Sequence, residues 1–224
     1  PINRVLFPAF SSLQADDERL QRTVVHSGRL LAAVIVPVGF GISAVADELV
    51  PVLYGTQWLD MIPVLSMFGL SAAVRGSTAI ASPLFNSCDR AGLSFRYSLV
   101  GTAIMVAAVL IAMPHGIAMV AAAVALSSCY ALFALRASIA LIGLGTKDVW
   151  TLLGPPAVAA GVMWVIVRIV RPYVVDVLNS TGLILLVHVL LGASVYALVL
   201  HLCSRQYLRD FIDAGARLVK SRRL

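Results

Sequence analysis

The chain has 224 residues, of which 60% are hydrophobic and only 12% are charged, and its mean hydropathy is +0.93. Soluble domains carry about 25% charged residues, so this composition excludes an ordinary soluble domain and predicts a polytopic membrane protein. The expected fold class is all-α, a bundle of six transmembrane helices. The chain starts at Pro1 without an initiator methionine, which favours a piece of a longer protein.

Residues 1–29 are expected to form a cytoplasmic segment and the start of the first helix. The acidic cluster Asp16, Asp17 and Glu18 suits the positive end of a helix dipole. The first span is predicted over 30–46, with Pro37 as a kink inside it. A loop with Trp58 as an interfacial anchor follows at the far membrane surface.

The second span, predicted over 61–88, carries a polar stripe. Its members follow one another at spacings of four, three, four and four, which places them on one face of a helix: Ser71, Arg75, Thr78, Ser82 and Asn86. A cation within a span costs roughly 2.5 to 3.5 kcal/mol on insertion scales. The stripe therefore predicts a polar cavity around Arg75, and the alternative is hydrogen bonding between helices without a role in transport.

Four further spans are expected at 97–113, 117–135, 150–167 and 178–203. The turn signal Met113-Pro114-His115-Gly116 separates two of them. Together, residues 30–204 make up the predicted six-helix lobe. Residues 205–224 place apolar side chains on one helix face and mostly charged ones on the other, which predicts a basic amphipathic cytoplasmic tail on the membrane surface.

The basic residues indicate the orientation of the spans. Six crossings leave only Arg168 and Arg171 on one side and Arg75 within the membrane. Fourteen of the 17 basic residues fall on the other side, which is therefore expected to be cytoplasmic, with both chain ends there: Arg4, Arg19, Arg22, Arg29, Arg90, Arg96, Arg136, Lys147, Arg205, Arg209, Arg217, Lys220, Arg222 and Arg223. The positive charge is thus a topology signal and an attraction to membrane lipids, and no nucleic acid partner is expected.

The sequence contains no arrangement of residues typical of an enzyme, a cofactor site or a metal site. Its cysteines show no paired spacing, so no catalytic residue, cofactor or metal is expected. His188 in the last span is interpreted as hydrogen-bonded within the bundle, with a proton relay as the alternative. Ser127, Ser128 and Tyr130 suit either a cavity wall or helix packing.

Several stretches resemble one known family. They are the opening 6–14 (LFPAFSSLQ) with 16–20 (DDERL), Pro37 with Gly39, 53–58 (LYGTQW), and the region of Arg75. In order and spacing they are similar to Wzx-like polysaccharide flippases, the polysaccharide-transporter branch of the multidrug, oligosaccharidyl-lipid, polysaccharide (MOP) superfamily. The resemblance extends to about residue 144 and is only hydropathic beyond it. Cys88-Asp89-Arg90 resembles a short turn of the family in which Asp89 replaces an expected glycine.

The resemblance implies about fourteen helices in two lobes with a central cationic cavity, of which this chain is most of the C-terminal lobe. It also implies the export of undecaprenyl-diphosphate-linked oligosaccharide repeat units across the bacterial cytoplasmic membrane, for surface lipopolysaccharide or exopolysaccharide. The expected partners are that lipid-linked oligosaccharide, membrane lipids and the N-terminal lobe of the same protein. On this resemblance Arg75 is the candidate substrate contact, to a phosphate or an acidic sugar. The neutral partners expected for sugar hydroxyls are Ser71, Thr78, Ser82 and Asn86. A small-molecule or drug exporter of the same superfamily, a membrane-embedded polymerase or acyltransferase, and a structural membrane subunit remain alternatives.

Overall fold

The computed structural model describes residues 2–13, 16–178 and 180–203. No strand occurs in these ranges, and six helical segments are long and apolar enough to cross a membrane. The predicted all-α bundle of six spans is therefore confirmed. The helices are α1 (Ile2–Ser11), α2 (Asp17–Ala44), α3 (Ala46–Tyr54), η1 (Thr56–Met61), α4 (Ile62–Ser77), α5 (Ala81–Ser87), α6 (Ala91–Ala112), η2 (Met113–His115), α7 (Ile117–Ser128), α8 (Ala131–Ala140), α9 (Thr146–Val177) and α10 (Thr181–Cys203).

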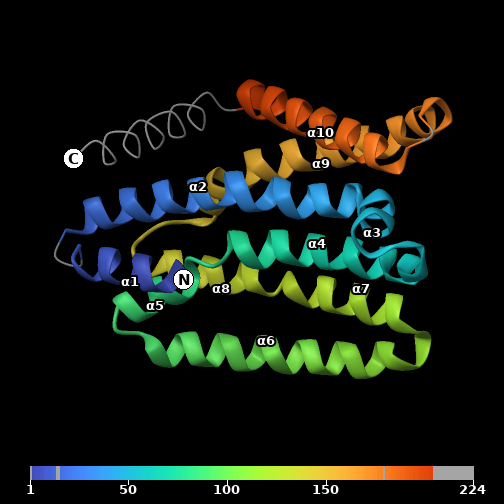
Figure 1. The fold of residues 1–224 in the computed structure, drawn as a ribbon. Coiled ribbons are helices and arrows are strands. Elements are labelled where there is room, and N and C mark those ends of the chain that lie inside the picture. The colour runs from blue at the N-terminus through green and yellow to red at the C-terminus, as the bar shows by residue number, and fades with distance from the viewer. Residues whose placement is uncertain (1, 14–15, 179, 204–224) are drawn as a thin grey trace.

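The long helices lie side by side in the order α10, α9, α2, α4, α7 and α6, and each contacts the next (Figure 1). The short helices α1 and α5 pack together at one end of the bundle, and α3 with η1 occupies the opposite end. A hydrophobic cluster fills the first of these ends and ties together α1, α2, α5 and α8 through Phe10, Leu20, Phe85 and Leu135. The two ends therefore hold different kinds of structure.

The first span is one continuous helix that begins well before the predicted residue 30. Asp16 caps it, since its carboxylate accepts a hydrogen bond from the backbone N–H of Arg19 at 3.1 Å. Asp17 and Glu18 lie in the first turn, where the helix dipole favours negative charge. Pro37 lies inside α2 without ending it. The chain turns at Val45 and immediately forms α3, a helix in a stretch that was expected to be a loop.

The second span is broken, although a continuous helix was predicted over 61–88. α4 ends at Ser77 and α5 starts at Ala81. The Thr78 hydroxyl donates to the backbone carbonyls of Val74 and Arg75 at 3.0 and 3.2 Å, and such local bonds compete with the helical pattern. Pro83 has no N–H to donate to residue 79 and crowds that carbonyl. Together these residues explain the interruption.

The remaining spans differ from their predicted ranges mainly in length. α6 starts six residues before the predicted position 97. α9 covers 146–177 instead of 150–167, and Pro172, which was expected in a loop, lies inside it without ending it. The fourth span is interrupted at residues 129–130 and continues as α8 to Ala140. The predicted turn at 113–116 is present, with Gly116 at φ +94°. The predicted tail at 205–224 lies outside the described residues.

Candidate functional site

A pocket of about 300 Å³ lies between the broken second span, the broken fourth span and α6. The interruption at residues 78–80 contributes Thr78 and Ala79 to its wall, and the one at 129–130 contributes Tyr130. Breaks in two neighbouring spans free backbone and side-chain groups from regular helix packing. Irregular backbone at membrane depth is tolerated where it lines a cavity or is buried in protein.

The walls of the pocket are rich in hydroxyl groups. Arg75 is the charged residue of the lining. Nine other lining side chains carry a hydroxyl: Thr78, Ser82, Ser94, Tyr97, Ser98, Thr102, Ser127, Ser128 and Tyr130. A guanidinium among neutral hydroxyls is suited to a polar anion, because the cation supplies charge and the hydroxyls supply both donors and acceptors.

Arg75 has no carboxylate partner in the part of the chain that the structure describes. Its side chain is exposed, and its polar contact is a long one, 3.9 Å from Nη1 to the sulfur of Met105 on α6. The guanidinium can donate up to five hydrogen bonds in a fork that matches phosphate or carboxylate oxygens. Its donors therefore stay available to a ligand in the pocket.

The five residues of the predicted stripe do not all meet in this pocket. Arg75, Thr78 and Ser82 line it. Ser71 is buried between α4 and α7, where its hydroxyl is 2.7 Å from that of Ser128, the interhelical bond that was the alternative interpretation of the stripe. Asn86 is exposed on α5 and is not among the lining residues. The break at 78–80 changes the helical register and separates the stripe into these parts.

The contribution of α6 was missed, although its sequence contains a usable signal. Ser94, Ser98 and Thr102 follow one another at spacings of four, and all three line the pocket. The same spacing rule that singled out the stripe around Arg75 identifies them as one helix face. Their small size and the absence of a charge made this face resemble ordinary helix packing.

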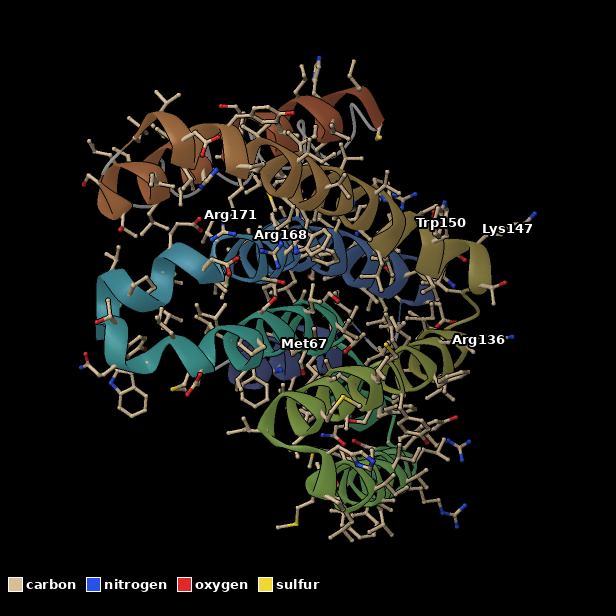
Figure 2. All side chains as sticks on the ribbon, turned by 90° about the vertical axis from the view of Figure 1, so that its right-hand side faces the viewer. Met67, Arg136, Lys147, Trp150, Arg168 and Arg171 are labelled. Atoms are coloured by element: carbon tan, nitrogen blue, oxygen red, sulfur yellow. The ribbon has the colours of Figure 1, made fainter. Side chains whose placement is uncertain are left out.

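A second polar cluster lies at the opposite end, where α3 meets α9 and α10. The Arg168 guanidinium donates to Asp47, and Arg171 Nε donates to Glu48 Oε1 at 2.7 Å. Glu48 is only 3% exposed although it was expected in a surface loop. Figure 2 labels both arginines on α9, beside the start of α3. Sequence reasoning missed these pairs because more than 120 residues separate their members.

His188 of α10 borders this cluster without a hydrogen bond. Its side chain is fully buried, and neither ring nitrogen has a partner among the described residues. Nδ1 lies 3.9 Å from Glu48 Oε1, and Glu48 Oε2 also lacks a partner. The interpretation of a histidine hydrogen-bonded within the bundle is therefore wrong for this structure. A buried polar group left unsatisfied costs about 1–3 kcal/mol, so this arrangement has unused binding capacity.

Comparison with known proteins finds one family match and several relatives. Residues 1–63 match the family described as "Polysaccharide biosynthesis protein". The chain is 28% identical over 110 residues to the lipopolysaccharide biosynthesis protein WzxC of Escherichia coli (strain K12), which is 49% of the chain and 22% of the relative. It is 24% identical over 217 residues to the succinoglycan biosynthesis transport protein ExoT of Rhizobium meliloti (strain 1021), 93% of the chain and 43% of the relative.

A third relative is the teichuronic acid biosynthesis protein TuaB of Bacillus subtilis (strain 168), 24% identical over 74 residues, 33% of the chain and 15% of the relative. No solved structure gives a significant match. The chain spans less than half the length of the curated relatives that it matches. These three relatives are named for the biosynthesis of lipopolysaccharide, succinoglycan and teichuronic acid, and one of them also for transport.

Proposed function

We propose that this chain, which is similar to proteins of polysaccharide biosynthesis and transport, forms the C-terminal portion of a Wzx-like transporter that exports lipid-linked oligosaccharide repeat units. The cargo is an undecaprenyl-diphosphate-linked oligosaccharide, which moves from the inner to the outer leaflet of the bacterial cytoplasmic membrane. An N-terminal lobe of the same protein supplies the other wall of the cavity. The two lobes then expose the cavity to each face in turn, as alternating access requires.

The pocket around Arg75 is the observation that carries this proposal. A diphosphate head with polar sugars cannot cross hydrocarbon unaided, because its charges and hydroxyls need partners. Arg75 offers a bidentate donor for phosphate or for an acidic sugar, and the surrounding hydroxyls offer neutral partners for sugar hydroxyls. The pocket is large enough for one polar group, and a cavity completed by a second lobe accommodates more of the cargo.

The distribution of charge supports an orientation with both ends of the chain in the cytoplasm. The end of the bundle with α1, α5 and the connection from α8 to α9 carries Arg90 and Lys147. At the end with α3, the basic residues Arg168 and Arg171 are paired with Asp47 and Glu48. Unpaired positive charge is thus concentrated at the end proposed to be cytoplasmic.

The test measures lipid-linked repeat units in cells that lack the gene and carry a plasmid copy of the full-length protein. In cells that lack the gene, we expect these units to accumulate on the cytoplasmic face of the membrane. The wild-type copy should remove this accumulation. Arg75→Ala should lower export about tenfold or more, since a hydrogen bond to a charged group contributes about 1.5–3 kcal/mol. Arg75→Lys should restore only part of it, because an ammonium group keeps the charge but not the bidentate geometry.

Arg96→Ala is the matched control, since Arg96 is exposed on α6 and is not among the residues lining the pocket. It should export at the wild-type rate at equal expression. Normal export by Arg75→Ala contradicts the role of this residue. Unchanged intermediates after loss of the gene contradict the flippase function itself.

A small-molecule exporter of the same superfamily is the second candidate, and the buried Glu48 favours it. An intramembrane carboxylate is a common element of ion-coupled exporters, and none was expected in the spans from the sequence. Glu48 is buried but already accepts a hydrogen bond from Arg171. This candidate would be supported over the flippase if loss of the gene made cells sensitive to small toxic compounds and lipid-linked sugars did not accumulate.

A further inference from the structure

The cluster between α3, α9 and α10 contains equal numbers of opposite charges before His188 is counted. Asp47 and Glu48 come from the first turn of α3, and Arg168 and Arg171 come from α9 (Figure 2). A neutral His188 leaves this cluster balanced. A proton on the imidazole adds one positive charge to a site that is closed to solvent on the side of Glu48 and His188.

The geometry places two partners on one carboxylate. Arg171 Nε is 2.7 Å from Glu48 Oε1, and His188 Nδ1 is 3.9 Å from the same oxygen. Glu48 Oε2 and both nitrogens of His188 are buried without a hydrogen-bond partner. A protonated imidazole carries two N–H donors, and an ionised carboxylate accepts through both oxygens. One added proton therefore allows the imidazolium of His188 to donate a charge-assisted hydrogen bond to the carboxylate of Glu48.

The elements around this site carry few other charged groups, and Asp176 near the end of α9 is exposed. α2 has no charged residue between 30 and 44 and contributes the hydroxyl of Ser43 beside Trp164 of α9. α4 has none before Arg75, and Asp60 of η1 is exposed. α10 contains no acidic residue, arginine or lysine over 181–203. The charge of His188 is therefore set against Asp47, Glu48, Arg168 and Arg171.

We propose that His188 and Glu48 form a proton-binding site, and that the bound proton draws Glu48 from Arg171 toward His188. Proton uptake then strengthens the contact of α3 with α10 and weakens its contact with α9. Asp47 keeps its pair with Arg168, so the proton changes the balance between the two contacts of α3 without releasing it from α9. The inference does not rest on the proposed cargo, since it concerns a site remote from the pocket around Arg75.

Hydrogen–deuterium exchange of the full-length wild-type protein in detergent tests this proposal. Exchange is compared at about pH 5.5 and about pH 8, on either side of the range in which histidine changes charge, with correction for the intrinsic exchange rate. Loss of one hydrogen bond to a charged group raises local opening about tenfold. At the lower pH we expect protection near Arg171 in α9 to fall about tenfold and protection near His188 in α10 to rise, while α6 stays unchanged.

His188→Gln should abolish both changes, because glutamine cannot take up the proton, and Glu48→Gln should abolish them because the proton loses its partner. His115→Gln is the matched control, since His115 is exposed on η2, and it should keep both changes. Equal protection of the wild type at the two pH values overturns the proposal without any variant. Changes of the same sign in α9 and α10, or a wild-type response in His188→Gln, also overturn it. If His188→Gln fails to fold, Glu48→Gln makes the same assignment.

Discussion

Asp89 adopts a backbone conformation that side chains other than glycine rarely take. Its φ is +56°, the one positive value at a non-glycine residue in the described ranges. It ends α5 in a Schellman motif, in which the Arg90 N–H donates to Phe85 and the Asp89 N–H donates to Asn86. α8 ends in the same pattern, and there the corresponding position is Gly143, with φ +78°. The positive φ at this position explains why glycine is expected in the turn that 88–90 resembles.

We expect the stability of variants at Asp89 to depend on how well the new residue tolerates a left-handed backbone conformation. Asp89→Val should lower the free energy of unfolding by roughly 1–2 kcal/mol, because a β-branched side chain clashes in this region. Asp89→Gly and Asp89→Asn should stay within about 0.5 kcal/mol of the wild type, since both residues tolerate it. Thermal unfolding of the purified protein in detergent measures the order. An equal loss in Asp89→Asn and Asp89→Val would show that the carboxylate matters and the backbone does not.

At the scale of helices, α2 and α4 cross in direct backbone contact. A Cβ atom on Gly39 would lie 2.5 Å from the carbonyl oxygen of Gly69, and one on Gly69 would lie 2.6 Å from that of Gly39. Glycine at a crossing allows two backbones to approach closely, which is a common basis of helix association in membranes. This contact holds the first span against the helix that carries Arg75.

Gly39→Val should prevent or strongly destabilise this crossing. The added side chain meets backbone atoms that cannot move aside, so we expect a loss of about 2 kcal/mol or more, in the range of severe overpacking. Gly41→Ala is the matched control, because a Cβ there meets only the end of Met163 at 4.0 Å, and it should fold like the wild type. The yield of monodisperse protein and its melting temperature measure both. A fully stable Gly39→Val would contradict the backbone contact.

The elements that the sequence predicted well are those set by composition and length. Long apolar runs, with the turn at Met113 to Gly116, are enough for six spans because a membrane has a fixed thickness. The breaks at 78–80 and 129–130 were not predicted, because side-chain hydroxyls such as that of Thr78 compete with the helix only in a particular local geometry. The polar stripe was therefore predicted on one continuous helix, and Ser71 and Asn86 were expected in the same cavity as Arg75. The pairs of Glu48 with Arg171 and His188 depend on tertiary folding, which periodicity does not report.

At the scale of the whole molecule, two polar sites lie toward different parts of the bundle. The pocket around Arg75 opens between α4, α6 and α7, and the charged cluster lies where α3 meets α9 and α10. In the row of helices, α2 lies between α9, which carries part of the cluster, and α4, which lines the pocket (Figure 1). A change in how α3 is held can reach α4 directly, because α3 and η1 contact it. This connection gives the proton site a structural route toward the pocket.

The charge of the whole chain predicts its orientation in the membrane, which cysteine labelling can test. In a background without Cys88, Cys129 and Cys203, Gln57→Cys of η1 and Gly92→Cys of α6 place single thiols at opposite ends of the bundle. Both positions are exposed, and a Cβ on Gly92 meets nothing within 4 Å. With Lys and Arg concentrated at the cytoplasmic end, a membrane-impermeant maleimide added to intact cells should label Gln57→Cys. Gly92→Cys should react only after the membrane is permeabilised. The reverse pattern would contradict the proposed topology and, with it, the proposed direction of export.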